Sequence, residues 1–142
     1  MTCGEVMTPN PKCCLPSDSA LRAARLMKIE DVGSLPVCSS GDSRRLVGII
    51  TDRDLALNVV AEGHDSNSTQ IQSIMTREPY TCREDEDLQT ALERMENNQV
   101  RRIPVVDRNG MLTGIISQAD IATRTQSREK TAEMVAEISR PS

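Results

Sequence analysis

The chain repeats itself, and this duplication constrains its fold more than any other feature. Residues 6–42 align with residues 74–110 at a shift of 68 positions. The first copy then has two extra residues in a turn, so residues 46–54 align with residues 112–120 at a shift of 66. A long-period repeat of whole supersecondary units predicts a repeated architecture. With two copies, we expect a closed pair that buries its apolar faces around a pseudo-twofold axis and has a cleft lined by equivalent residues.

Each copy is predicted to form a strand, a helix, two strands and a second helix, which is an α/β (α+β) arrangement. Pro36 indicates an edge strand or a β-bulge, and Asn109-Gly110 indicates a hairpin. The predicted elements are residues 12–15, 20–30, 34–38, 46–50 and 52–60 in the first copy, and residues 80–83, 87–98, 103–106, 112–116 and 118–124 in the second.

The predicted domain organisation follows from the repeat. Residues 3–60 form the first repeat, a polar linker spans residues 61–72, and residues 73–125 form the second repeat. Residues 126–140 are predicted to form a further C-terminal helix with a narrow apolar stripe. This helix either contacts a second copy of the chain or packs on its own module. The stripe consists of Ala132, Met134, Val135 and Ile138.

Composition excludes several classes of partner. The chain has 142 residues, a net charge of −4, one tyrosine, and neither tryptophan nor phenylalanine. Nucleic acids and anionic membranes need clustered positive charge, and base stacking needs aromatic side chains, so we expect neither partner. The sequence has no apolar run of about 18 residues, and its N-terminus does not resemble a signal peptide. These features predict a cytoplasmic protein.

Five cysteines accompany a single histidine, His64, and no Cys-x-x-Cys pair occurs. A zinc site needs about four closely spaced ligands, so no metal site is predicted. We expect five reduced thiols that are mostly buried. Cys13 and Cys14 are either both core thiols, or one of them is redox-sensitive. Lys12 is their only basic neighbour in sequence, which does not support a low thiol pKa.

The most informative polar motif follows the last strand of each copy. Thr51 ends the strand in the first copy and Asp54 follows three positions later; Ser117 and Asp120 are their counterparts in the second. This spacing is typical of a capping box, in which the hydroxyl and the acid cap the helix. It also suits a ligand, because a helix N-terminus presents N–H groups to phosphate and a carboxylate accepts hydrogen bonds from a ribose diol.

Three motifs occur in the same order in both copies. They are Val6-Met7-Thr8-Pro9, Ser34-Leu35-Pro36-Val37 and 46–55 in the first copy, and Ile74-Met75-Thr76, Arg102-Ile103-Pro104-Val105 and 112–121 in the second. In their order, spacing and duplication, these motifs resemble the tandem cystathionine-β-synthase (CBS) domain pair, often called a Bateman module, over residues 3–125. The resemblance implies two β-α-β-β-α repeats packed through their sheets, a homodimer, and an adenosine ligand such as AMP, ADP, ATP, NAD or S-adenosylmethionine between the repeats.

The resemblance implies two ligand sites, each built from both copies. The first site would use Ser117 and Asp120 for ribose, Arg101 and Arg102 for phosphate, and Thr8, Cys13, Val32 and Gly33 around the adenine. The second site would use Thr51 and Asp54 for ribose, with Thr76, Thr81, Val100 and Arg101 around the base.

The second site lacks the basic pair, because Gly33-Ser34 occupy the matching positions. Arg53 is the candidate substitute, unless it pairs with Asp52 or Asp54. We therefore expect a phosphorylated ligand at the first site, since charge-assisted contacts to phosphate are strong. The alternative is that Arg101 and Arg102 are solvated surface charges and that both acids only cap helices.

The sequence is compatible with a binding module, an interaction module or an enzyme. The preferred one is a regulatory adenine-nucleotide sensor that requires no cofactor and acts on a separate, unidentified effector protein. The alternative is a dimeric structural or interaction module with no physiological nucleotide ligand. An enzyme is disfavoured, because the sequence offers no set of nucleophile, base and orienting residue.

Overall fold

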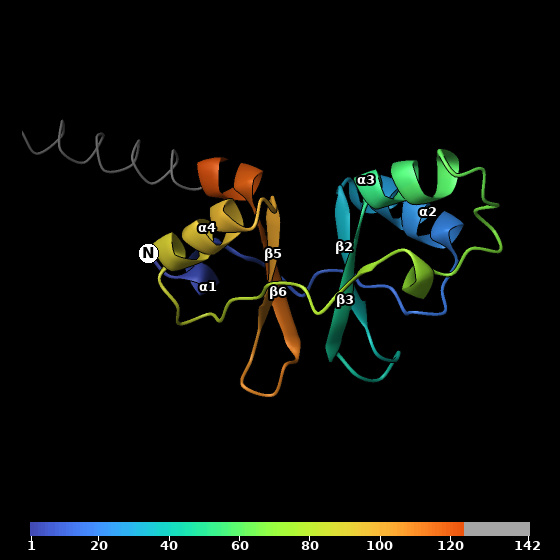
Figure 1. Cartoon of the computed structure of the whole chain (residues 1–142). Coiled ribbons are helices and arrows are strands. Elements are labelled where there is room, and N and C mark those ends of the chain that lie inside the picture. The colour runs from blue at the N-terminus through green and yellow to red at the C-terminus, as the bar shows by residue number, and fades with distance from the viewer. Residues whose placement is uncertain (124–142) are drawn as a thin grey trace, which may run out of the picture.

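The computed structural model describes residues 1–123 and shows two similar halves, each with a three-stranded sheet covered by helices (Figure 1). The predicted C-terminal helix, residues 126–140, lies outside the described residues. The strands are β1 (Thr8–Pro9), β2 (Ser34–Cys38), β3 (Leu46–Thr51), β4 (Thr76–Arg77), β5 (Arg102–Val106) and β6 (Leu112–Ser117). The helices are α1 (Cys3–Val6), α2 (Ala20–Glu30), α3 (Asp52–Leu55), the π-helix η1 (Ala56–Val60), the 3-10 helix η2 (Ile71–Ser73) and α4 (Leu88–Asn97), and residues 118–123 are also helical.

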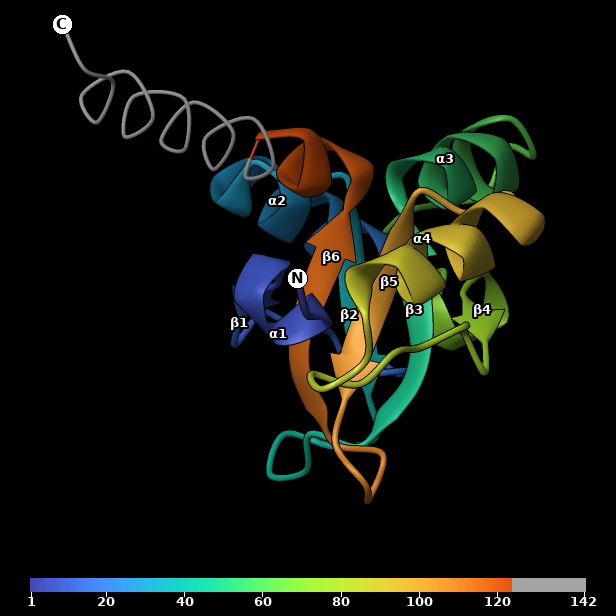
Figure 2. The same ribbon diagram turned by 90° about the vertical axis from the view of Figure 1, so that its left-hand side faces the viewer.

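The two copies exchange their leading segments. One sheet has the strand order β2-β3-β4 and the other has the order β1-β6-β5. The sheet of the first half therefore includes β4 from the start of the second copy, and the sheet of the second half includes β1 from the start of the first copy. Figure 2 shows β1 close to β6 and β4 close to β3, where each pair is antiparallel. Each half is therefore completed by residues distant in sequence.

The cores follow the same exchange. Cys3 and Val6 of α1 are fully buried in the core of the second half, which contains α4, β5 and β6. Ile71 occupies the position equivalent to Cys3 and is fully buried in the core of the first half. Burying one such aliphatic side chain contributes about 1.5–3 kcal/mol, so the exchanged segments help to hold the two halves together.

The predicted pseudo-twofold symmetry is confirmed in the backbone. Asp31 and Gln99, which lie 68 positions apart, both adopt the left-handed conformation with φ of 54° just after their helices. The hairpin ends of the two halves also bond each other reciprocally. The Leu46 amide donates to the Gly110 carbonyl at 3.1 Å, and the Leu112 amide donates to the Arg44 carbonyl at 2.7 Å.

The prediction for the proline-containing strand is confirmed. The strand β2 lies at the edge of its sheet, with a register shift between Val37 and Cys38, and β5 repeats this arrangement. The turn before Gly110 forms the predicted hairpin, with φ of 78° at this glycine. The described part of the chain, residues 1–123, contains no helix with the length and apolar character needed to cross a membrane.

The first predicted strand of each copy was wrong. Residues 12–15 and 80–83 form only isolated parallel bridges, at Cys14 and at Cys82. The Cys14 amide donates to the Pro36 carbonyl at 2.9 Å, but the Pro36 nitrogen has no hydrogen to donate to the preceding carbonyl of this segment. The parallel ladder therefore ends after one residue. The helix predicted for residues 52–60 forms, but its second half is the wider π-helix.

A glycine in each central strand allows the exchanged strand to approach closely. A Cβ atom on Gly48 would lie 2.7 Å from the Met75 sulfur and 2.8 Å from the Thr76 carbonyl oxygen, and Gly114 is equally crowded by Met7 and Thr8. These distances are too short for a methyl group, so the exchange requires glycine at both positions.

We expect Gly48→Ala to lower the free energy of unfolding by about 1–3 kcal/mol, as overpacking typically does. Gly41→Ala is the matched control, because no atom lies within 4 Å of a Cβ at this position. It should change stability by less than about 0.5 kcal/mol. Urea unfolding followed by circular dichroism measures both values. Equal stabilities for the two variants would contradict the close crossing.

Candidate ligand site between the repeats

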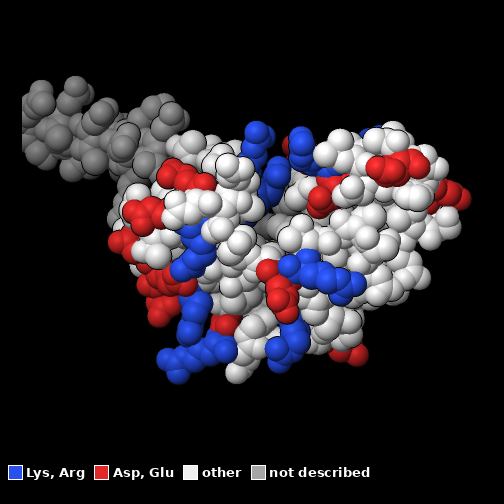
Figure 3. Space-filling model, viewed as in Figure 1, with Lys and Arg blue, Asp and Glu red and all other residues white. Residues whose placement is uncertain are grey.

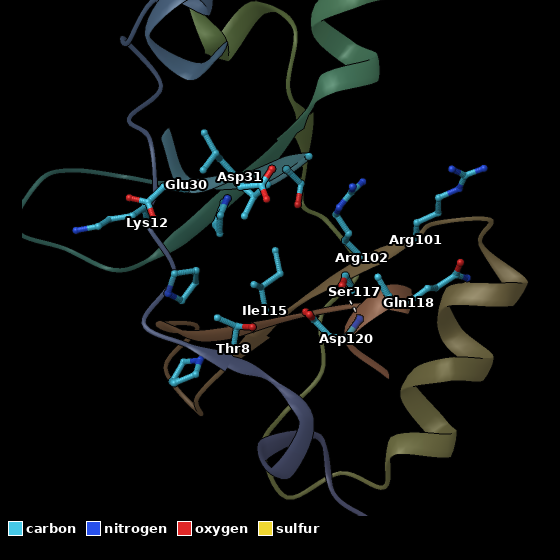
Figure 4. A pocket seen from close by; sticks show the side chains of 18 of the residues that line it. Thr8, Lys12, Glu30, Asp31, Arg101, Arg102, Ile115, Ser117, Gln118 and Asp120 are labelled. Carbon is cyan, nitrogen blue, oxygen red and sulfur yellow. Dashed lines mark hydrogen bonds between the residues drawn. The ribbon is translucent and has the colours of Figure 1, made fainter. Parts of the chain in front are cut away.

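A cavity of about 760 Å³ lies between the two halves. The space-filling view shows the hollow, with lysine and arginine side chains gathered at its upper rim (Figure 3). The structure brings seven of the eight residues predicted for the first site together in the cavity wall. They are Thr8, Val32, Gly33, Arg101, Arg102, Ser117 and Asp120. Figure 4 labels Thr8, Arg101, Arg102, Ser117 and Asp120.

Ser117 and Asp120 lie where β6 ends and the helix of residues 118–123 begins. The Ser117 hydroxyl accepts a hydrogen bond from the Asp120 amide at 3.1 Å and so caps this helix. Within residues 1–123, no group donates a hydrogen bond to the Asp120 carboxylate and no ion pair involves it. The carboxylate is therefore available to a ligand in the cavity.

The equivalent motif in the first copy is closed. The Thr51 hydroxyl accepts from the Asp54 amide at 3.1 Å, and the Asp54 carboxylate accepts from the Thr51 amide at 3.0 Å. This is a complete capping box. The same sequence spacing thus produces a filled cap in one copy and an open carboxylate in the other.

The two arginines enter the cavity from β5 and the residue before it. Arg102 pairs with Ser117 across β5 and β6, which sets the guanidinium and the hydroxyl at one end of the cavity. Arg102 is half-buried and Arg101 is exposed. A Cβ atom on Gly33 would overlap Nη2 of Arg102, so the missing side chain at Gly33 provides the space for this guanidinium.

Charged residues that the sequence analysis missed line the cavity away from the arginines. Lys12, Glu30 and Asp31 all lie in the wall (Figure 4). Asp31 directly follows α2 and adopts the left-handed conformation that ends this helix. The motif search could not have found them, because each lies outside the repeated strand-end motif.

Cys13 is the predicted first-site residue that the cavity wall does not include. Its sulfur accepts a hydrogen bond from Arg44 Nη1 at 3.7 Å, while Arg44 Nη2 donates to the Pro11 carbonyl at 3.0 Å. This arginine holds the Cys13 side chain toward the hairpin of the first half instead of toward the cavity.

The residues predicted for the second site come from both halves of the structure. Thr76 in β4 pairs with Ile49, the Thr81 carbonyl accepts from Arg94 at 2.6 Å, and Val100 packs against the second core. Arg101 lines the first cavity. Arg53 is exposed and forms no side-chain ion pair within the described residues.

All five cysteines are free thiols, and only Cys13 is partly exposed. Burial raises the pKa of the Cys14 thiol to about 12 and, with a contribution from the neighbouring Cys13, the pKa of the Cys38 thiol to about 12. Burial also raises the pKa of Cys3 and of Cys82. Within residues 1–123, no group of three cysteine, histidine or acidic residues is arranged to hold a metal ion.

The fold and cavity define a two-repeat α/β module with a ligand-sized space between its repeats. The CBS domain family model matches residues 3–61 and 71–126. The uncharacterized protein YlbB of Bacillus subtilis is 37% identical over 135 residues, which cover 95% of this chain and 89% of YlbB. The chain belongs to the CBS domain family, with two copies of the domain.

Two similar proteins have solved structures. Hypoxic response protein 1 of Mycobacterium tuberculosis is 35% identical over 85% of this chain and 82% of its own sequence. A crystal structure of Hypoxic Response Protein I holds two coordinated zinc ions and matches with a TM-score of 0.77 and 32% identity, over 87% of this chain and 98% of the other. CBSX2 of Arabidopsis thaliana, in complex with AMP, matches with a TM-score of 0.76 and 27% identity, over 90% of this chain and 98% of the other.

The thiol environments predict selective alkylation. At pH 8, iodoacetamide should modify Cys13 in the folded protein, because thiolate and exposure are both required. Cys14 and Cys38, with pKa values of about 12 and buried sulfurs, should react only after unfolding. Peptide mass spectrometry with and without urea measures the order. Modification of Cys38 as fast as Cys13 in the folded protein would contradict the packing.

Proposed function

We propose that the protein is a regulatory module that binds an adenosine ligand, with AMP, ADP, ATP or NAD as candidates, in the cavity between its repeats. The observation that carries this proposal is the open Asp120 carboxylate beside Ser117 and across the sheet from Arg102. The AMP complex of CBSX2 supports an adenine nucleotide as the ligand class.

Each part of such a ligand has a matching group in the wall. The Asp120 carboxylate would accept hydrogen bonds from the ribose diol, and the Ser117 hydroxyl lies beside it. Arg101 and Arg102 would contact the phosphate with charge-assisted hydrogen bonds. Thr8, Val32 and Gly33 would surround the adenine. The second site, with its closed Asp54 cap, is the weaker candidate for ribose.

Regulation would follow from where the wall residues originate. Val32 and Gly33 come from the first half, whereas Ser117 and Asp120 come from the second. A ligand that touches both halves favours the arrangement in which its contacts are complete. The output would be read by a separate effector protein, and we place the module in the cytoplasm as a homodimer with reduced thiols.

The alternative is a dimeric interaction module with no physiological nucleotide. Ile29 and Val60, which are 76% and 77% exposed, are large apolar side chains that such a contact would cover. Catalysis is not part of the proposal.

Thermal unfolding in the presence of AMP, ADP, ATP or NAD tests the proposal. A ligand at 100 times its Kd stabilises the fold by about 2.7 kcal/mol, so the Tm of the wild type should rise. Asp120→Ala should lose this rise. Circular dichroism is the suitable readout, because the chain has a single tyrosine and no tryptophan.

Asp54→Ala is the matched control. It should lower the basal Tm, because it breaks a capping box worth about 1 kcal/mol, yet it should keep the ligand-induced rise. A wild type that shows no shift with any of these compounds at millimolar concentration would reject the sensor and favour the interaction module.

A further inference from the structure

Arg102 lies between the cavity and a carboxylate of the first half. Arg102 lines the cavity, and its guanidinium occupies the space above Gly33. A Cβ atom at Gly33 would overlap Arg102 Nη2 and would lie 3.1 Å from Asp52 Oδ2. The guanidinium and this carboxylate oxygen therefore flank the same point, although they form no ion pair in the described structure.

Asp52 is held in this position by its local bonds. Its amide donates a hydrogen bond to the Gly33 carbonyl at 2.9 Å. This bond fixes the first residue of α3 next to Gly33, where the Arg102 guanidinium lies. Its Oδ1 atom accepts a hydrogen bond from the Arg53 amide at 2.8 Å. The other oxygen, Oδ2, is the one that faces the space beside Gly33.

The second copy cannot form the same arrangement. The residue equivalent to Asp52 is Gln118, which is uncharged, and the residue equivalent to Gly33 is Arg101, which has a long side chain. The carboxylate of Asp52 next to the Gly33 space therefore has no counterpart in the second copy. It breaks the electrostatic symmetry of a backbone that is otherwise duplicated.

We propose that Asp52 is a specificity-determining residue that lowers the preference of the cavity for phosphorylated ligands by competing for Arg102. This inference rests on the proposed function. A phosphate monoester carries a charge of about −1.5 to −2 at neutral pH, and the nearby Asp52 carboxylate offsets part of the attraction that Arg102 exerts on it. An uncharged nucleoside has no such interaction to lose.

The competition also links the ligand to the first half. A phosphate that draws Arg102 toward the cavity removes a cation from the N-terminal turn of α3, where Asp52 lies. Linkage requires the reverse effect as well: a change that strengthens the hold of Asp52 on Arg102 weakens phosphate binding by the same factor. Asp52 thus connects the phosphate position of the cavity with the start of the helical segment 52–60.

Titration calorimetry with AMP and with adenosine tests the inference. Asp52→Asn should tighten AMP binding by about two- to fivefold, the range that a partly exposed charge interaction produces, and should leave adenosine binding unchanged. Asp42→Asn is the charge-matched control, because Asp42 is exposed like Asp52 but lies in the turn between β2 and β3, outside the cavity wall. It should change neither affinity.

The Asp52→Asn substitution in the Arg102→Gln variant tests whether Asp52 affects AMP binding through Arg102. If Asp52 acts through Arg102, Asp52→Asn should not tighten AMP binding in Arg102→Gln. Equal tightening of AMP and adenosine, the same gain from Asp42→Asn, or a gain that persists in Arg102→Gln would each overturn the inference while leaving nucleotide binding intact.

Failure of the proposed function gives a different result, in which the wild type binds neither AMP nor adenosine. The Asp52–Arg102 interaction is then measured without ligand, by a double-mutant cycle of urea unfolding. The Asp52→Asn and Arg102→Gln effects should be non-additive, whereas Asp42→Asn and Arg102→Gln should add. Additivity in both cycles would overturn the interaction itself.

Discussion

The exchange of leading segments between the two copies is the constraint on which the rest of the structure depends. Residues 8–9 complete the sheet of the second half, and residues 76–77 complete the sheet of the first. Each exchange needs a glycine in the central strand beneath it. Because the chain crosses between the halves here, Thr8 and the following residues become part of the cavity wall. The packing requirement and the ligand-sized space thus have the same origin.

Most of the fold could be predicted from the sequence, because its signals are local and occur twice. Proline in an edge strand, Asn109-Gly110 in a hairpin and the serine and aspartate helix caps each have one dominant geometry. The exchange could not be predicted, since nothing local shows which sheet Val6-Met7-Thr8 joins. The prediction of a first strand in each copy was wrong for a related reason. Pro36 cannot donate a hydrogen bond to the segment of residues 12–15, and this matters only because the fold places that segment beside Pro36.

The candidate site was predictable to a similar degree. Seven of the eight predicted residues line the cavity, and four of them, Arg101, Arg102, Ser117 and Asp120, do so because their motif positions lie at the start of β5 and the end of β6. Cys13 does not, because the partner of its thiol, Arg44, comes from the hairpin turn of the first copy, where the repeat register changes. Lys12, Glu30 and Asp31 were missed because their placement depends on how the two halves meet.

The two copies have similar backbones but different charged residues, and this difference makes the two candidate ligand sites unequal. In the first copy the Asp54 carboxylate closes a helix cap, and Asp52 faces the arginine of the other copy. In the second copy the Asp120 carboxylate stays open and Arg102 enters the cavity. A symmetric pair would offer two equal sites, and a ligand would have no reason to bind one of them first. Under the proposed function, the open Asp120 carboxylate and the cavity arginines would direct a phosphorylated ligand to one site, Asp52 would weaken its hold there, and the ligand would act on the two halves differently.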